Sequence, residues 1–312
     1  MFKKTVLTAA LCVAAALAGS AGAQQQQYIP MISKGFQHQF WQAVKAGAEQ
    51  AGKDYNVRIT FEGPETEAMV DKQIDMLSSA LAKHPAAIGF AALDSKAAIP
   101  LLKKAQAAKI PVIAFDSGVD SDIPTTTATT DNRAAAALAA DKMAQLIGDA
   151  GEVALVVHDQ TSRTGIDRRD GFVERMKAAH PNVKVVSVQY GAGDHLKSTE
   201  IAKSMLQAYP NLKGIFGANE GSIAGVINAV RETHRKIVVI GYDSGKQQKD
   251  AIREGIEAGA ITQNPVGIGY KTVEAAVKTL KGEKVPKVID TGFYWYDKTN
   301  IDDPKIAAVL YD

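Results

Sequence analysis

Short apolar runs rich in β-branched residues alternate with longer segments of helical period, and this alternation constrains the fold more than any other feature. The run PVIAF at 111–115 has the length and composition of a buried strand. The segment 66–83 instead places Met69, Leu77 and Leu81 in one apolar stripe, as a half-buried helix requires. Strands and helices that alternate in this way are typical of βα units around a parallel sheet.

The expected elements fall into two series. The first is strand 27–33, helix 38–53, strand 57–61, helix 66–83, strand 86–92, helix 96–108 and strand 111–115. The second is helix 133–147, strand 152–157, helix 165–179, strand 183–188, helix 195–208, strand 214–218, helix 221–233, strand 237–242 and helix 247–254. Since a domain usually has roughly 100 to 200 residues, the two series predict an α/β protein with two Rossmann-like lobes.

The N-terminus has the three parts of a secretory signal peptide. Lys3 and Lys4 precede an apolar run at 6–18, and the small residues Ala21–Ala23 follow it. The run is shorter than the roughly 20 apolar residues of a membrane-spanning helix. We therefore predict that residues 1–23 are cleaved and that the mature chain is periplasmic. Cys12, the one cysteine, lies in the removed segment.

The charge of the chain argues against a nucleic-acid partner. The full sequence has 36 Lys and Arg against 34 Asp and Glu, and the two lysines of the signal peptide account for the difference. A nucleic-acid-binding protein usually gathers a basic excess on one face, and the basic pairs here, such as Lys103-Lys104, are short. The mature chain is predicted to be monomeric and to bind no nucleic acid.

Motifs for catalysis or metal binding are absent from the sequence. It contains no G-x-S-x-G, no H-E-x-x-H, no phosphate-binding loop and no cysteine pair, and its six histidines are scattered. The pair His158-Asp159 resembles part of a hydrolase relay, but neighbours on a strand point to opposite faces, so we expect no relay there. No cofactor, no metal and no catalytic residue is predicted.

Two strands end in the same letters, Asp116-Ser117-Gly118 and Asp243-Ser244-Gly245. In open parallel sheets ligands bind beyond the carboxyl ends of the strands, so both carboxylates are expected at a crevice, although each could instead form a local turn. Polar or aromatic residues follow other strands too, among them Ser33, Phe40 and Trp41. Carboxylates and aromatic rings suit a neutral ligand rich in hydroxyl groups.

The chain resembles the ribose-type periplasmic sugar-binding proteins of ABC importers, which share their fold with LacI-type repressors. The resemblance covers about residues 28–295 and rests on the order of ISKGFQHQFWQAVKAGAEQAG, PVIAFDSG, TTDNRAAAALAADKMA, RTGIDRRDGF, GIFGANEGSIAGV, VVIGYDSG and AITQNPVGIGY. It implies a type I periplasmic binding protein fold, in which two lobes are joined by three crossings. The expected lobes are 28–131 with 265–290, and 132–263 with 291–312.

The resemblance also implies which residues bind the ligand. The matched positions, with Ser33 and Ser117 from the strand ends, are Ser33, His38, Phe40, Trp41, Asp116, Ser117, Arg168, Asn219, Asp243 and Gln263. Ser117 stands where ribose binders have arginine, and Gly193 where they have a stacking phenylalanine, which puts ribose itself in doubt. Other roles remain open for several of these residues: helix caps for His38 and Asn219, a hinge contact for Gln263 and a solvated helix face for Arg168. Lys34, Asp94, Asp159 and Glu220 are further candidates at strand ends.

The sequence thus predicts an exported, non-enzymatic receptor that captures a small neutral sugar or polyol and delivers it to the permease of an ABC importer. Three alternatives remain. The first is a receptor for a sugar or furanose-like signal that a chemotaxis or sensor protein reads. The second is a repressor, which would need an N-terminal DNA-binding helix pair, and the third is a sugar-modifying enzyme that uses Asp116 and Asp243 as acid and base.

Overall fold

The structure, a computed structural model, describes residues 26–312 and contains two six-stranded sheets. The first sheet has the order β11-β5-β4-β3-β1-β2 and the second β12-β10-β9-β8-β6-β7. The strands of the first sheet are β1 Tyr28–Ile32, β2 Arg58–Glu62, β3 Ile88–Phe90, β4 Val112–Phe115, β5 Thr126–Thr129 and β11 Val288–Asp290. Those of the second are β6 Gly151–Val157, β7 Val183–Tyr190, β8 Leu212–Gly217, β9 Val238–Tyr242, β10 Gly259–Gln263 and β12 Phe293–Tyr296.

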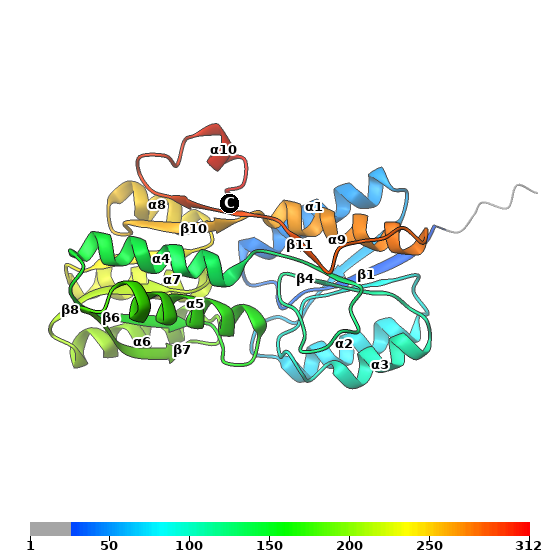
Figure 1. Cartoon of the computed structure of the whole chain (residues 1–312), viewed down its shortest axis with the longest axis horizontal. Helices are drawn as coiled ribbons and strands as arrows, with labels where there is room; N and C mark the ends of the chain where they lie inside the picture. The colour runs from blue at the N-terminus through cyan, green and yellow to red at the C-terminus, as the bar shows by residue number, and fades with distance from the viewer. Residues whose placement is uncertain (1–25) are drawn as a thin grey trace, which may run out of the picture.

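Helices cover both faces of each sheet, and the two resulting α/β lobes lie side by side (Figure 1). The helices on the first sheet are α1 Gln39–Asp54, α2 Val70–Ala82, α3 Ile99–Ala107 and α9 Pro265–Leu280. Those on the second are α4 Asn132–Ile147, α5 Arg163–Ala179, α6 His195–Ala208, α7 Glu220–Thr233, α8 Lys246–Glu254 and the short α10 Pro304–Ala307. The prediction of an α/β protein with two lobes is confirmed, and all pairings but the antiparallel β10–β12 pair are parallel.

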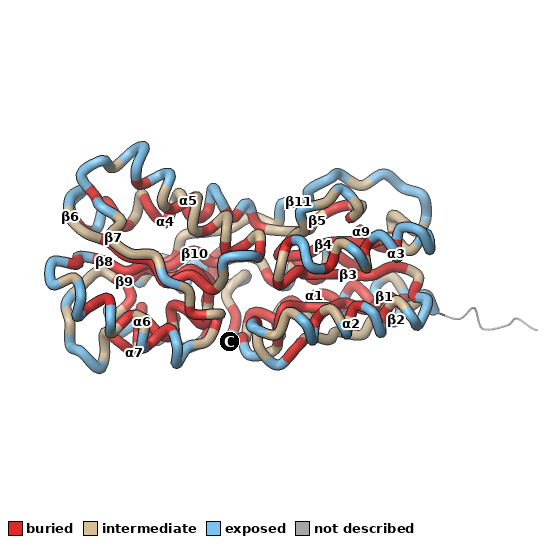
Figure 2. The backbone as a smooth tube through the Cα atoms, turned by 90° about the horizontal axis from the view of Figure 1, so that it is seen from below, coloured by how far each residue is buried: buried red, intermediate tan, exposed pale blue. Residues whose placement is uncertain are grey.

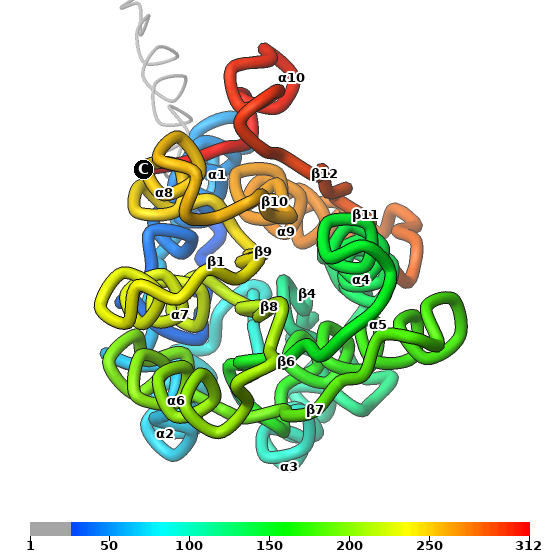
Figure 3. Tube along the Cα trace, turned by 90° about the vertical axis from the view of Figure 1, so that its left-hand side faces the viewer, coloured from blue at the N-terminus to red at the C-terminus, as the bar shows by residue number. Residues whose placement is uncertain are grey.

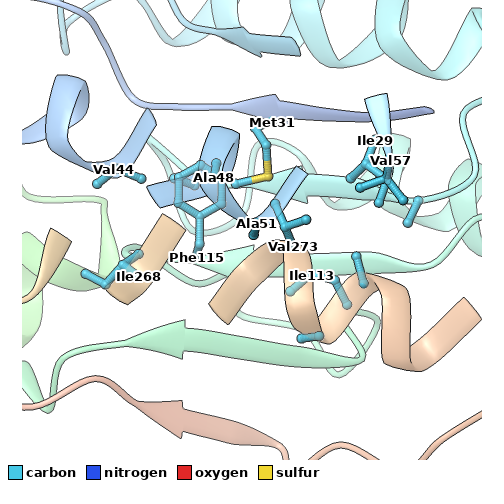
Figure 4. Close-up of a cluster of buried hydrophobic side chains, with 14 of the residues drawn as sticks. Ile29, Met31, Val44, Ala48, Ala51, Val57, Ile113, Phe115, Ile268 and Val273 are labelled. Atoms are coloured by element: carbon cyan, nitrogen blue, oxygen red, sulfur yellow. The ribbon is translucent and has the colours of Figure 1, made fainter. Parts of the chain in front are cut away.

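Each lobe has a buried layer on both sides of its sheet, and inner strands such as β3, β4 and β10 are buried along their whole length (Figure 2). In the first lobe, α1 and α9 pack together over β1 and β4, where Ile29, Val44 and Ile268 belong to one cluster (Figure 4). A Cβ atom on Gly269 would lie 1.9 Å from the Val44 carbonyl oxygen. Glycine is therefore what allows these two helices to approach so closely.

The chain passes between the sheets three times. It leaves the first sheet after β5 and enters α4, returns after β10 to α9, and crosses again from β11 to β12. The sequence did not predict the strands β5, β10, β11 and β12, because segments of three to five residues show too little periodicity to be recognised. Helix α2 begins at Val70 rather than 66, and the residues before it form turns.

The C-terminal segment links the lobes again. After β12 it runs through α10 at the edge of the molecule and ends beside α8, where Asp312 pairs with Lys249 (Figure 3). Just before this end, Tyr311 packs into the core cluster of the first lobe.

The predicted signal peptide lies outside the described residues. Within 26–312, no helix has the length and apolar character needed to cross a membrane.

Candidate functional site

A cavity lies where the carboxyl ends of the two sheets face each other. The volume of this cavity is about 20 Å³, far below the roughly 300 to 1,000 Å³ of sites for drug-sized ligands. The residues that line it are Lys34, His38, Phe40, Trp41, Glu67, Asp116, His158, Thr164, Arg168, Asn219, Asp243 and Gln263. They come from both lobes, and eight of the ten residues selected from the sequence are among them.

Asp116 and Asp243 occupy equivalent positions in the two lobes. Each follows a strand directly and has a left-handed backbone, with φ of 54° and 79°, a conformation that aspartate tolerates better than most residues. The backbone N–H of Asp116 donates to Ala128 of the neighbouring strand, and that of Asp243 donates to Ile261 in the same way. The repeated strand end therefore turns both carboxylates into one shared space.

The carboxylate of Asp243 is anchored on its own side of the cavity. Its Oδ1 accepts a hydrogen bond of 2.7 Å from the Gln263 side chain, and its Oδ2 accepts one of 2.9 Å from the backbone N–H of Glu220. Arg168 lies 4.0 Å away. Gln263 also accepts from the Thr130 hydroxyl, 2.9 Å away, so it joins the first two crossings as well as lining the cavity.

Asp116, in contrast, has no protein donor at its carboxylate among the residues described. Burial raises its pKa to about 6, although Lys34 and Arg168 act in the opposite direction. A buried acceptor without a protein partner is costly. The Asp116 carboxylate therefore keeps acceptor capacity that no described protein group satisfies.

Arg168 is buried, so it does not belong to a solvated helix face. Its Nε donates to the Asn132 side chain at 2.8 Å and its Nη1 to the Ala218 carbonyl at 2.9 Å. The guanidinium carbon lies 3.7 Å from the centre of the Tyr242 ring, a favourable stacking position. Because a guanidinium has five N–H donors, it retains donors for a ligand.

His38, Trp41 and Glu67 form one buried group on the first lobe. The Glu67 carboxylate accepts from the Trp41 indole at 2.8 Å and lies 3.2 Å from His38 Nδ1. Burial alone would lower the pKa of His38, but the Glu67 charge raises it to about 9. His38 precedes α1 without capping it through its side chain. Its Nε2 instead donates to the Gly193 carbonyl in the second lobe, 2.9 Å away.

The surroundings of Gly193 explain why position 193 has no aromatic side chain. Its φ is +67°, and a Cβ atom would lie 3.0 Å from the Glu67 carboxylate and 3.3 Å from the His38 ring. A side chain here would therefore be strained and would press against both residues. The glycine permits the contact between His38 and the second lobe.

Phe40 and Trp41 have two roles, because both line the cavity and both belong to the first-lobe core. Asn219 also has two: it lines the cavity, and it caps α7 by accepting from the Ser222 N–H. Ser33 and Ser117 are fully buried but are not among the lining residues.

Lys34 proves to be a lining residue, and so do Glu67, His158 and Thr164, which the sequence did not predict to contact a ligand. Lys34 donates to the Thr164 hydroxyl at 3.2 Å and lies 3.8 Å from Glu67. Glu67 lies in the loop after β2 and His158 directly follows β6, so a search for polar residues after every strand would have found both. Thr164 lies in the first turn of a helix, where such a search does not look.

A relay between His158 and Asp159 was not expected, because neighbours on a strand point to opposite faces. That reason is wrong, since β6 ends at Val157, before both residues. His158 Nε2 lies 3.7 Å from the Asp159 carboxylate and 3.0 Å from the Thr164 hydroxyl. Burial, with the nearby Lys34 charge, lowers the pKa of His158 to about 3. Asp159 instead accepts hydrogen bonds from the Ser162 backbone and hydroxyl at the start of α5. Within 26–312, no group of three or more His, Cys, Asp or Glu side chains is placed to hold a metal ion.

Comparison with known proteins agrees with this geometry. Residues 29–284 match the family described as "Periplasmic binding protein domain". The D-allose-binding periplasmic protein of Escherichia coli is 27% identical over 82% of this chain and 85% of that protein. A carbohydrate transporter solute-binding protein of Agrobacterium radiobacter, solved with D-arabinose, is 33% identical with a TM-score of 0.89, over 92% of this chain and all of that one.

A second solved structure is an ABC transporter solute-binding protein of Agrobacterium vitis with bound D-fucose. It is 34% identical with a TM-score of 0.88, over 91% of this chain and all of that one. These similarities extend over both lobes, and they confirm the resemblance and the fold expected from the sequence. The chain therefore belongs to the periplasmic binding protein family and has the two-lobed fold of its ribose-type members.

Proposed function

We propose that this protein captures a small neutral monosaccharide or polyol between its lobes and delivers it to the permease of an ABC importer. The observation that carries the proposal is the single cavity into which each lobe contributes one aspartate, Asp116 and Asp243. A ligand bonded to both carboxylates favours the closed arrangement of the lobes, because only there are all its contacts made.

The charges around the cavity support a ligand without net charge. Three cationic side chains line it and three carboxylates oppose them: Lys34, His38 and Arg168 against Glu67, Asp116 and Asp243. Burial would raise the pKa of Glu67, but Lys34 and His38 hold it well below its usual value. Since an unpaired charge is expensive to bury, an ionic ligand would disturb this balance.

The polar and aromatic groups suit a sugar. The Asp116 carboxylate accepts from hydroxyl groups, the donors of Arg168 bind hydroxyl or ring oxygens, and Phe40 and Trp41 cover the apolar C–H face. Related solute-binding proteins were solved with D-arabinose, D-fucose and α-D-tagatopyranose. We therefore propose pentoses, 6-deoxyhexoses, ketohexoses and polyols as the ligand classes to test.

We also propose that the signal peptide is removed near Ala23 and that the protein acts in the periplasm as a monomer without enzymatic activity. The lobes we propose are 28–131 with 265–290 and 132–263 with 291–312. The family consists of binding proteins, and recovery of bound sugar in unchanged form would support the absence of turnover. Reading of the closed form by a chemoreceptor remains a separate prediction.

The test is a thermal-shift screen of residues 24–312 against neutral sugars and polyols, with sugar acids and sugar phosphates as charged counterparts. A ligand at 100 times its Kd stabilises the native protein by about 2.7 kcal/mol. For a chain of this size we expect the midpoint to rise by roughly 4 to 5 °C. A panel in which only charged compounds raise the midpoint, or none does, would contradict the proposal.

Site variants then test the two aspartates. We choose Asp116→Asn and Asp243→Asn because asparagine, unlike alanine, tolerates the left-handed backbone of both positions. Each is expected to weaken binding at least about tenfold in calorimetry, since a charge-assisted hydrogen bond is lost. Asp75→Asn, at an exposed position of α2, is the matched control and should bind normally. Unchanged affinity in both site variants would remove the site assignment.

A further inference from the structure

The N-terminus of α1 is capped by the opposite lobe. His38, its N-cap residue, makes no side-chain cap bond. The Glu220 carboxylate instead accepts from the backbone N–H of Gln39 at 2.9 Å and from that of Phe40 at 3.0 Å. Glu220 is the first residue of α7, which packs on β8 and β9 of the second sheet. A carboxylate is the group best suited to the free N–H groups at a helix start.

The same boundary holds a second cap in the reverse direction. Gly245 precedes α8 and has no side chain with which to cap it. The Gln39 side-chain oxygen of the first lobe accepts from the backbone N–H of Lys246, 2.8 Å away. Each lobe thus completes a helix start of the other, and these bonds form only where the lobes meet.

Tyr311, near the C-terminus, adds a third contact at this place. Its ring is buried in the first-lobe core, 6.1 Å from the Phe40 ring. Its hydroxyl accepts from the backbone N–H of Ser244 at 3.2 Å and donates to Glu220 at 3.4 Å. Ser244 directly follows Asp243, the ligand-facing aspartate at the end of β9. The Tyr311 side chain therefore contacts both the first-lobe core and this strand end of the second lobe.

These contacts lie next to the cavity without facing it. Glu220 and Gln39 line a wider outer cleft, and only His38 borders both spaces. The segment that Glu220 holds is the start of α1, which supplies Phe40 and Trp41 to the cavity wall. On its other side, the backbone N–H of Glu220 donates to the Asp243 carboxylate. Glu220 therefore connects cavity walls from both lobes.

We propose that Glu220, Gln39 and Tyr311 form a cross-lobe clamp whose members are positioning residues: they hold the lobes closed and fix the start of α1 against the ligand. The role in binding rests on the proposed function, but the clamp itself consists of protein groups alone. It therefore contributes to closure with and without ligand. Ligand release requires it to open, so its loss should act mainly on the dissociation rate.

The experiment measures the separation of the lobes directly. Cys12 is the one cysteine of the sequence, and it precedes the predicted cleavage site. Cysteines can therefore be introduced as unique labelling sites at two exposed positions, Lys72 on α2 and Gln207 on α6. Spin labels there report the distance distribution between the lobes. Glu220→Gln keeps the shape of the side chain but replaces one acceptor oxygen with a donor group.

Without ligand, Glu220→Gln is expected to shift the distance distribution toward longer separations, and Tyr311→Phe to shift it in the same direction by less. Glu254→Gln and Tyr294→Phe, at exposed positions, are the matched controls and should leave it unchanged. Distributions for both clamp variants that match the controls would overturn the proposal, whatever their thermal stability. Because this readout needs no ligand, it tests the clamp even if the sugar assignment fails.

With a ligand from the screen, stopped-flow kinetics gives the second readout. Glu220→Gln is expected to raise the dissociation rate roughly tenfold, because one charge-assisted bond holding the closed form is lost. The association rate should stay within about threefold of the original. An unchanged dissociation rate, alongside normal binding, would refute the positioning role while leaving the proposed function intact.

Discussion

The affinity for a neutral sugar should depend on pH through Asp116. Burial raises the pKa of this carboxyl to about 6, with Lys34 and Arg168 opposing the shift. Hydroxyl groups donate more strongly to a carboxylate than to a neutral carboxyl. We therefore expect the ligand to bind the ionised form better, so that affinity falls as pH drops through 6.

The size of the effect follows from the fraction ionised. At pH 5, about one unit below the pKa, roughly a tenth of the molecules carry the Asp116 charge, so Kd should rise about tenfold from its value at pH 8, or about 1.4 kcal/mol. His38, with a pKa of about 9, stays protonated across this range, and His158, with a pKa of about 3, stays neutral. Neither contributes to the expected change.

The stability of the free protein should change in the opposite direction. The folded-state pKa of Asp116 lies above the ordinary value of 3.8 for an aspartate, so the native state binds a proton more tightly than the unfolded chain. Protonated Asp116 therefore favours folding, and its contribution to stability falls by up to about 3 kcal/mol as pH rises from about 4 to above 6.

Calorimetric titrations at pH 5, 6, 7 and 8 measure the change in affinity. Asp116→Asn is the control: it should bind more weakly at every pH but with little change between pH 5 and 8. Burial also raises the pKa of Glu220 despite the nearby His38 charge, and the control separates the two groups. Equal wild-type affinity at pH 5 and 8, or a full pH dependence retained in Asp116→Asn, would refute the reasoning.

Three further substitutions test the site and the packing. Arg168→Lys should weaken ligand binding at least about tenfold and lower the free energy of unfolding by about 1 to 3 kcal/mol, because an ammonium group cannot replace the planar guanidinium that reaches Asn132. Normal affinity would show that the guanidinium geometry is unimportant for binding. Gln73→Leu should cost about 3 kcal/mol in denaturant unfolding, since the buried amide makes three hydrogen bonds to the backbone just beyond the ends of β1 and β3; a cost under about 1 kcal/mol would contradict this. Gly269→Ala should destabilise by about 1 to 3 kcal/mol, because the new methyl group would lie 1.9 Å from the Val44 carbonyl oxygen, and an unchanged midpoint would mean that α1 and α9 can separate freely.

The sequence was most informative where a property is local and repeated. The period of the apolar residues indicated which segments are helices and which are strands, and most of the core elements were placed within a few residues. The position of Asp116 and Asp243 at strand ends predicted that each carboxylate lies at a crevice, because ligands bind beyond the carboxyl ends of parallel strands. That the two carboxylates share one cleft was implied by the family resemblance. Neither inference requires knowledge of the packing.

The short strands of the crossings were beyond this reasoning. β5, TTAT, and β11, VID, each have three or four residues, too few to show an alternation. They pair as strands because the neighbouring parts of the sheets supply hydrogen-bonding partners. Tertiary context decided their structure.

The contacts between the lobes were also decided by the tertiary structure alone. The sequence offered His38 as a possible cap for α1, yet the cap is Glu220, 180 positions or more away along the chain. Glu67 and Thr164 reach the cavity through a turn and through the approach of the second lobe. A sequence determines local conformation through the residues' own preferences, whereas such partners depend on how two independently formed sheets meet, which no local pattern encodes.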